Sequence, residues 1–424
     1  MKWKSGKLAK DTSLLTLGNG FRVFSQGIVF IIIARSMGAD GYGGFVTLIA
    51  IAGMLSGLVG CGSHVLLTRD TALDPHKFHS AWGHTLFSLA ISMPIIFIVY
   101  LILANLILPN KISWMPILFI GIADLIFWPL SNVCVSAYQG FERMGRVSHM
   151  IIAPVVMRLF AACVFLLLFI NENVQHRMLL TWSGLYLIAA MAAAIYTQWM
   201  VYKDLGKPVF LNSNWFAKIK ESMPFALWAI SDKLYIDADK VMLAHMTSLD
   251  VTGIYSAAYR LIDIFLLPIQ SLIGAATPRF FQEGSKGVHQ SLRYSIKLIK
   301  IPFIYSLSIG IIIYLSSDFI LFILGSGFYE STEAIRYLAW IPIIILPKIL
   351  LQSILASSGF QKKGMQIVFT GAVINIISNV FLIPIMGWKG AAIATYIAEI
   401  SMSLIMVILI NHLLKNTHCE AMVI

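Results

Sequence analysis

The residues with the clearest chemical capacity are charges placed inside apolar segments. The stretch SDKLYIDADK, residues 231–240, carries three Asp and two Lys between the apolar runs MPFALWAI and VMLAHM. A charge at the centre of a membrane helix costs about 2.5–3.5 kcal/mol on insertion scales, so it tends to face a cavity or a partner. Apolar segments contain six bases and six acids: Arg22, Arg158, Lys233, Lys240, Arg260 and Lys348, and Asp124, Asp232, Asp237, Asp239, Asp263 and Glu399.

The bases favour an anionic substrate. Arg and Lys bind phosphate through charge-assisted hydrogen bonds in a partly desolvated site. Arg22 and Arg158 have no acid at helical spacing within their own segments, although Asp124 or an acid of the other half of the chain could reach them. We therefore expect a cationic, substrate-binding cleft with these candidate residues: Arg22, Arg158, Lys233, Lys240 and Arg260.

The acids allow two interpretations. Lys233, Asp237 and Lys240 follow the spacing i, i+4, i+7, so one Asp could bridge two Lys on a helix face as a structural ion-pair network. Acids without a basic partner would instead bind a coupling ion, H⁺ or Na⁺, and Asp124 and Glu399 are the first candidates. Some charges could also lie near segment ends and extend to the membrane surface. The ion-coupling or charge-network candidates are Asp124, Asp232, Asp237, Asp239, Asp263 and Glu399.

Apolar segments of membrane-spanning length must position these residues. The chain is 58% hydrophobic and 12% charged, with a mean hydropathy of +0.82, which excludes a soluble globular protein. About 20 apolar residues cross a hydrocarbon core as a helix. The sequence predicts an all-α polytopic membrane protein with about twelve spans: 13–34, 45–67, 81–107, 114–137, 147–170, 179–201, 223–245, 252–276, 301–324, 335–356, 366–386 and 390–413.

The basic residues predict the orientation. Of 31 Lys and Arg, 20 lie in the termini and the even-numbered loops, 5 in the odd-numbered loops and 6 within spans. Basic residues are retained on the cytoplasmic side, so both termini should be cytoplasmic. This asymmetry, with anionic lipid headgroups, accounts for the net charge of +11 and removes the need for a nucleic-acid partner. Cysteine spacing suggests no metal site, and neither a Walker sequence nor G-x-S-x-G is present, so we expect no enzyme and no cofactor.

Two pairs of similar motifs suggest an internal duplication. ARSMGADGYGGF at 34–45 resembles AHMTSLDVTGIY at 244–255, and AYQGFERMG at 137–145 resembles ASSGFQKKG at 356–364, at offsets of 210 and 219 residues. Short helix connections draw on the same few residue types, which is the alternative explanation. Duplication predicts parallel repeats. The expected division is an N-terminal six-helix bundle (1–201), a cytoplasmic linker (202–222) and a C-terminal six-helix bundle (223–424).

Several motifs together resemble a known family. They are Arg22 with ARSMGADGYGGF, then YQGFERMGR, then YIDADKVMLAHM with VTGIYSAAYRL, and NIISNVFLIPIMGWKGAAIATYIAE with Asn375, Asn379 and Glu399. The sequence is similar, nearly end to end, to the O-antigen and polysaccharide flippases of the multidrug/oligosaccharidyl-lipid/polysaccharide exporter (MOP) superfamily. SDKLYIDADK contains more acids than the family pattern requires.

The resemblance implies the fold and the function. It implies two six-helix bundles in a V, as in multidrug (MATE) exporters, and a secondary transporter working by alternating access. The substrate would be an undecaprenyl-diphosphate-linked oligosaccharide, moved from the cytoplasmic to the periplasmic leaflet of a bacterial inner membrane for O-antigen, lipopolysaccharide or another surface polysaccharide. Membrane lipids, a polysaccharide polymerase and a chain-length regulator would be its partners, and a monomer would suffice.

Two alternatives stay open. A drug or metabolite cation antiporter of the same superfamily would share the spans and the coupling acids, but it would prefer an acidic cavity, and the six bases within spans argue against it. A membrane-embedded polymerase or glycosyltransferase would need extended loops outside the membrane, whereas the predicted outside loops are short.

Overall fold

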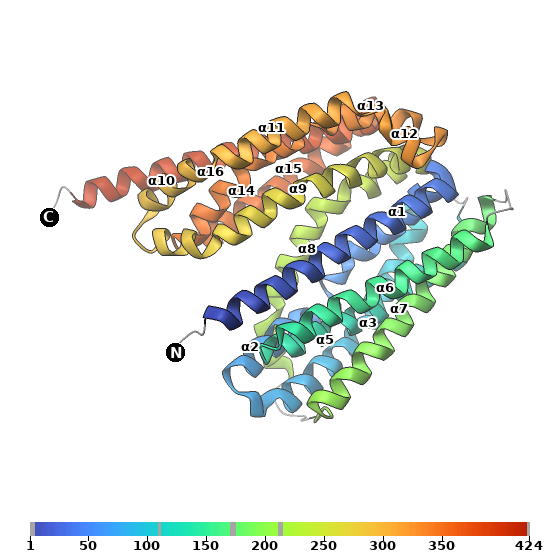
Figure 1. Ribbon diagram of the computed structural model, residues 1–424, viewed down its shortest axis with the longest axis horizontal. Helices are drawn as coiled ribbons and strands as arrows, with labels where there is room; N and C mark the ends of the chain where they lie inside the picture. Colours follow the sequence, from blue (N-terminus) through green and yellow to red (C-terminus); the bar gives the residue numbers. More distant parts are fainter. Residues whose placement is uncertain (1–4, 109–111, 170–174, 211–214, 422–424) are drawn as a thin grey trace. The chain divides into compact units, whose positions relative to one another are not determined.

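The computed structural model describes residues 5–108, 112–169, 175–210 and 215–421, which contain helices and no strand (Figure 1). The all-α fold class is confirmed. Within these residues, eight helices are long and apolar enough to cross a membrane, or ten when the bent pairs 288–315 and 326–357 each count as one span. Helices suit this environment because lipid cannot hydrogen-bond to an open backbone.

The first long helix is two helices joined at a glycine. α1 (Ser5–Ser56) is interrupted at Gly38, where φ is 69° and ψ is −178°. Glycine adopts this backbone conformation without the steric cost that other residues meet. The break lies between the predicted first and second spans, 13–34 and 45–67, and confirms their separation.

The second span differs from its prediction because it is broken within the membrane-length segment. The helix ends at Ser56, a short 3₁₀ turn, η1 (Val59–Gly62), follows, and α2 (Ser63–Leu73) begins after it. Three consecutive residues have positive φ angles: Gly60 (74°), Cys61 (53°) and Gly62 (76°). Hydropathy averages over such a break, so the sequence predicted one helix where the structure has two.

The rest of the first half consists of long helices. α1 packs against α6, α6 packs against α7, and α2 packs against α5 (Figure 1). The elements are η2 (Pro75–Lys77), α3 (Phe78–Ile107), α4 (Trp114–Ile122), η3 (Ala123–Phe127), α5 (Trp128–Gly140), α6 (Met144–Leu168), α7 (Gln175–Leu205) and α8 (Trp215–Met246).

The second half also consists of packed helices. α15 packs against α16, and α14 packs against both α9 and α16. The elements are α9 (Leu249–Gly284), α10 (Val288–Leu298), α11 (Lys300–Leu315), α12 (Phe319–Leu324), η4 (Ser326–Phe328), α13 (Tyr329–Leu338), α14 (Ile341–Ser357), α15 (Gln361–Met386) and α16 (Trp388–Ala421).

The predicted ninth span, 301–324, is shorter than expected. α11 ends at Leu315, and the polar residues Ser316, Ser317 and Asp318 separate it from α12. Arg336 of α13 explains the interruption, because its guanidinium donates to Ser317 Oγ at 2.7 Å and to Asp318 at 3.1 Å. Counting both parts of α1 separately and adding the charged helix α8 to the ten spans brings the total to the predicted twelve.

The chain divides into two compact units, residues 1–237 (unit 1) and 238–424 (unit 2), and the boundary lies within α8. The predicted boundary was instead a linker at 202–222. Within unit 1, the chain after α7 is attached to α3: Val209 N donates to the His79 carbonyl at 2.9 Å, and the Lys207 carbonyl lies 2.8 Å from His79 Nδ1. The division into two duplicated bundles stays a prediction.

Both pairs of similar motifs fall where one helix gives way to the next. Residues 34–45 surround the break at Gly38, and residues 244–255 surround the start of α9, where Ser248 Oγ accepts from Val251 N at 3.2 Å. The other pair surrounds the α5–α6 and α14–α15 connections. This placement agrees with duplication and with the alternative that helix connections reuse the same residues.

Glycines bring α8 close to its neighbours in unit 1. A Cβ on Gly57 would lie 2.9 Å from the backbone nitrogen of Ile230, and a Cβ on Gly62 would lie 2.5 Å from the Ser222 carbonyl oxygen. Small residues allow such close helix packing in membranes. These contacts attach the first part of α8 to the region of the α1–α2 break.

Candidate functional site

The fourth span contains a π-helical turn, η3, between α4 and α5. A π turn adds one residue to a helical turn, changes the direction of the side chains around it and is frequent at functional sites. Asp124 lies within this turn and Trp128 directly follows it. The π turn therefore positions one acid and one large aromatic side chain within a single span.

The side chains around the π turn form a network with Arg158 of α6. The Tyr186 hydroxyl donates to Asp124 Oδ1 at 2.6 Å. The guanidinium carbon of Arg158 lies 4.6 Å from the centroid of the Tyr186 ring and 5.3 Å from that of Trp128. A cation–π contact contributes about 0.5–1 kcal/mol at exposed sites and about 2 kcal/mol when desolvated. Two aromatic rings thus hold the cation in place.

Charge balance around Asp124 involves two of the predicted bases. Its carboxylate interacts electrostatically with Arg158 and, more weakly, with Lys233 of α8. This supports the expectation that Asp124 reaches Arg158 from another span. Among the described residues, Arg158 makes no ion pair with a carboxylate within 4.0 Å, and its side chain is partly exposed. Among these residues, the guanidinium is thus held by aromatic rings and by the more distant Asp124 charge rather than by a close carboxylate.

The network rests on an aromatic core that includes a family motif. Phe45, the last residue of ARSMGADGYGGF, packs edge-on against Tyr186 and Trp182, with ring centroids 5.6 and 5.8 Å apart. Tyr42 of the same motif packs against Phe30 at 5.5 Å. Phe45 therefore packs against the Tyr186 ring that contacts Arg158. This contact gives the motif a structural role beside the network.

The other predicted charges of unit 1 lie on α1 and α8. Arg22 is partly exposed, and its buried Nε has no hydrogen-bond partner among the described residues. Asp237 approaches α1, because a Cβ on Gly53 would lie 3.3 Å from its Oδ2 atom. The side chain of Asp232 lies outside the described residues. The structure thus brings Asp124, Arg158 and Lys233 into one electrostatic network.

In unit 2, the remaining charges of SDKLYIDADK meet tyrosines of α9. The Tyr255 hydroxyl donates to Asp239 Oδ2 at 2.7 Å, and both residues are buried. The Lys240 ammonium lies 6.0 Å from the centroid of the Tyr259 ring. On α9, Arg260 is partly exposed and Asp263 is exposed. Tyrosines thus contact both an acid and a base of the charged stretch.

A buried ion pair links α14 and α16. Lys348 Nζ lies 2.7 Å from Glu399 Oε1, with side-chain exposures of 11% and 2%. The stretch that ends at Glu399 also contains two asparagines on α15. The Asn379 amide donates to Asn375 Oδ1 at 2.9 Å. Glu399 was expected to lack a basic partner, and both residues could have extended to the membrane surface. The expectation for Glu399 was wrong, and the structure favours an interior ion pair over the alternative of extension to the surface, because the two side chains are 2.7 Å apart and largely buried.

Sequence reasoning missed the aromatic members of these sites. Tyr186, Trp128 and Tyr255 lie within predicted spans and were not among the predicted site residues. Their ring and hydroxyl contacts join residues 16 to 62 positions apart in the chain, so no local spacing indicates them. The one available signal was that acids within spans need donors, and a tyrosine hydroxyl is such a donor.

Another motif of the family resemblance, YQGFERMGR, forms a connection outside these sites. The Tyr138 hydroxyl donates to Asp204 Oδ2 at 3.0 Å, and Arg146 pairs with the same oxygen at 2.9 Å. A Cβ on Gly140 would lie 2.7 Å from Thr71 Cβ of α2. The motif thereby fixes the α5–α6 connection to the ends of α7 and α2.

Comparison with known proteins identifies the family. The model of the family described as polysaccharide biosynthesis protein matches residues 8–283, and the MatE model matches residues 224–381. An uncharacterized membrane protein of Methanocaldococcus jannaschii is 26% identical over 235 residues, and that match covers 55% of each chain. The chain thus aligns with about half the length of this curated relative.

Solved structures share the fold. An inward-facing multidrug resistance MATE transporter of the MOP superfamily superimposes with a TM-score of 0.73 at 14% identity, covering 93% of this chain and 96% of its own. The lipid II flippase MurJ, in an inward closed conformation, superimposes with a TM-score of 0.71 at 12% identity, covering 94% and 87%. A MOP transporter from Pyrococcus furiosus gives 0.62 at 13% identity, covering 95% of each chain. The chain belongs to the polysaccharide biosynthesis protein family, and it shares the fold of transporters of the MOP superfamily.

Proposed function

We propose that this protein flips a polyprenyl-diphosphate-linked oligosaccharide between membrane leaflets by alternating access. The observation that carries the proposal is Arg158, a guanidinium held by two aromatic rings without a carboxylate ion pair among the described residues. Arg suits a diphosphate because its planar fork donates two parallel hydrogen bonds. The family match supports a role in polysaccharide assembly.

The pathway and the direction belong to the same proposal. The substrate is an undecaprenyl-diphosphate-linked repeat unit of O-antigen, lipopolysaccharide or another surface polysaccharide, moved from the cytoplasmic to the periplasmic leaflet of a bacterial inner membrane. Both termini are cytoplasmic, and the monomer works beside a polymerase and a chain-length regulator. The excess of basic residues in alternate loops supports this orientation.

We also propose that transport is coupled to H⁺ or Na⁺. Asp124 and Asp239 are the acids best placed for this, since each accepts a hydrogen bond from a tyrosine and lies within a span. Flipping by reconstituted protein should then respond to an imposed proton or sodium gradient, and Asp239→Asn should remove the response.

The test measures the substrate directly. A strain lacking the gene should accumulate lipid-linked repeat units that a membrane-impermeant lectin cannot reach in spheroplasts. Wild-type protein should restore lectin access, and Arg158→Glu should reduce the rate about tenfold or more, equivalent to about 1.4 kcal/mol. Arg177→Glu is the matched control, because Arg177 is exposed at the start of α7.

Two results would contradict the proposal. Full activity of Arg158→Glu at wild-type protein level would show that the guanidinium does not bind substrate. Normal lectin access in the deletion strain, together with altered tolerance of cationic drugs, would favour the cation antiporter of the same superfamily.

A further inference from the structure

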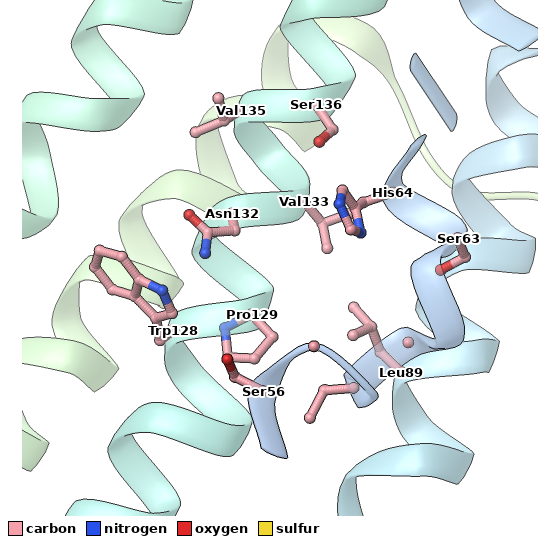
Figure 2. A pocket seen from close by; sticks show the side chains of 13 residues that line it. Ser56, Ser63, His64, Leu89, Trp128, Pro129, Asn132, Val133, Val135 and Ser136 are labelled. Atoms are coloured by element: carbon pink, nitrogen blue, oxygen red, sulfur yellow. The ribbon is translucent and has the colours of Figure 1, made fainter. Parts of the chain in front are cut away.

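A cavity opens beside the break between α1 and α2. It has a volume of about 280 Å³ and lies entirely within unit 1, between the turn η1, α3 and α5. Figure 2 shows its side chains arranged around the space, from the broken segment and α2 on one side and from α5 on the other. Ligand pockets in proteins are typically about 300–1,000 Å³. The cavity therefore suits one small ring rather than a large drug.

The lining of the cavity is polar but contains no fixed charge. Five of its thirteen residues carry hydroxyl, amide or imidazole groups, and none of the thirteen is Asp, Glu, Lys or Arg. A phosphate or a divalent cation would lack a counter-charge here. A neutral ligand with several hydroxyl groups fits this chemistry. The polar residues are Ser56, Ser63, His64, Asn132 and Ser136.

One of these groups is buried without a partner. Ser63, the first residue of α2, is 1% exposed, and its Oγ makes no hydrogen bond among the described residues. Buried polar groups in native proteins are nearly always hydrogen-bonded, so an unpaired one requires an explanation. A ligand hydroxyl in the adjoining cavity would supply the bond. His64 and Asn132 are exposed and can be reached from outside.

Trp128 connects this cavity to the anion site. Its indole lines the cavity, and the Arg158 guanidinium lies 5.3 Å from its ring centroid. Tryptophan offers a large, rigid and amphipathic contact surface. The apolar face of a sugar ring can lie against such a surface while polar neighbours bind its hydroxyls. A diphosphate at Arg158 would place the first attached sugar at this cavity.

We propose that the cavity at the α1–α2 break binds the sugar ring attached to the diphosphate of the lipid-linked substrate. This inference rests on the proposed flippase function and adds a specific subsite to it. Trp128 contacts the ring, and Asn132, His64 and Ser63 bind its hydroxyls. The site selects a lipid diphosphate that carries sugar over one that does not.

The test compares two classes of lipid. Full-length protein in lipid nanodiscs is titrated with sugar-free undecaprenyl diphosphate and with undecaprenyl diphosphates carrying one glucose, galactose, N-acetylglucosamine or N-acetylgalactosamine. We expect at least one sugar-bearing lipid to bind about tenfold more tightly, the effect of two hydrogen bonds of ordinary net strength. Microscale thermophoresis gives both dissociation constants and hence their ratio.

Variants assign the selectivity to the cavity. Asn132→Leu and Trp128→Leu should each reduce the ratio of the two dissociation constants towards one. Ser131→Ala is the matched control, because Ser131 lies on the same helix but bonds to the Phe127 carbonyl and does not line the cavity. Melting temperatures of the variants show whether each is folded, and Asn132, being exposed, should tolerate Leu.

The outcomes separate the two proposals. If every sugar-bearing lipid binds no more tightly than the sugar-free lipid, the sugar subsite is wrong while the diphosphate site stands. If the ratio exceeds one but Asn132→Leu and Trp128→Leu leave it unchanged in folded protein, the sugar binds elsewhere. If no lipid diphosphate binds, the proposed function itself fails.

Discussion

Each of the two units contains a tyrosine that donates to an aspartate, but the two units also contain bases in different surroundings. Tyr186 bonds to Asp124 at 2.6 Å in unit 1, and Tyr255 bonds to Asp239 at 2.7 Å in unit 2. In unit 1 the base, Arg158, lies over aromatic rings. In unit 2, Lys348 is in direct contact with Glu399 and both are buried.

This difference separates two uses of charge in a membrane interior. A buried ion pair cancels its own field and holds helices together, and removing one member leaves the other uncompensated. A guanidinium held by rings keeps its positive charge, because an aromatic face attracts the cation without neutralising it. Under the proposed function, Arg158 of unit 1 offers its charge to substrate, whereas the buried Lys348–Glu399 pair holds α14 and α16 of unit 2 together.

The largest expected effect comes from breaking the ion pair of unit 2. Glu399→Ala should lower the free energy of unfolding by about 3–5 kcal/mol, because it leaves the Lys348 ammonium buried without its carboxylate. Thermal unfolding of detergent-purified protein would measure the loss. Replacing both residues, as Lys348→Met with Glu399→Gln, should recover most of it. A single variant as stable as wild type would show that the pair does not hold α14 and α16 together.

The two tyrosine hydroxyls should have similar effects on stability. Tyr186→Phe and Tyr255→Phe each remove a hydrogen bond to a carboxylate, which contributes about 1.5–3 kcal/mol. Chemical denaturation of the two variants under identical conditions would compare them. If only one of the two variants lost stability, the two tyrosine–aspartate pairs would be alike in geometry but not in their contribution to the free energy of unfolding.

Substitution of Arg158 should affect transport more than stability, whereas substitution of Glu399 should chiefly affect stability. Arg158→Met should lower the free energy of unfolding by only about 1–2 kcal/mol, since it removes cation–π contacts and no ion pair. Flipping of the lipid-linked substrate should fall much further than this change in stability predicts. Unfolding and lectin-access measurements on the same preparation would test both parts. If Arg158→Met strongly destabilised the protein but left the flipping rate per folded molecule unchanged, Arg158 would have a structural role and not a role in transport.

The smallest expected change in stability comes from an exposed ion pair, and it separates the effect of burial from that of the distance between the charges. Arg69 and Glu221 of unit 1 are 2.6 Å apart, about as close as Lys348 and Glu399, but their side chains are 45% and 49% exposed. Exposed ion pairs contribute about 0.2–1 kcal/mol. Glu221→Gln should therefore change thermal stability very little, and a loss as large as that of Glu399→Ala would mean that burial does not distinguish the two pairs.

Hydropathy determined which segments are helices, but it did not determine how charges are paired. Long apolar runs predicted most spans because only a helix satisfies its backbone in lipid. The partnership of Lys348 with Glu399 joins residues 51 positions apart, and no periodicity within one helix reveals it. Residue types alone identified both as ionisable residues within spans. Their neutralisation required the packing of α14 against α16.

The breaks inside predicted spans were equally beyond the sequence, unlike the break at Gly38. Gly38 lies where a connection was expected, and its φ of 69° explains why glycine is there. The α1–α2 break and the π turn at Asp124 fall within apolar runs, where hydropathy is uniform. Tertiary contacts support both irregularities: Gly60 N donates to Ser92 Oγ at 2.7 Å, and Tyr186 bonds to Asp124. Such long-range supports cannot be read from a local window.

The close packing of α8 against Gly57 and Gly62 has a consequence for biosynthesis. The ribosome delivers the chain to the membrane from its amino end, so seven earlier helices are complete before α8 emerges. Unit 1 extends to residue 237, and its glycine-lined surfaces receive their partner only when α8 has been inserted. Maturation of the first half must therefore wait for translation to pass the segment after α7. A ribosome stalled near residue 210 would leave a nascent chain with these surfaces uncovered, an early target for membrane quality control.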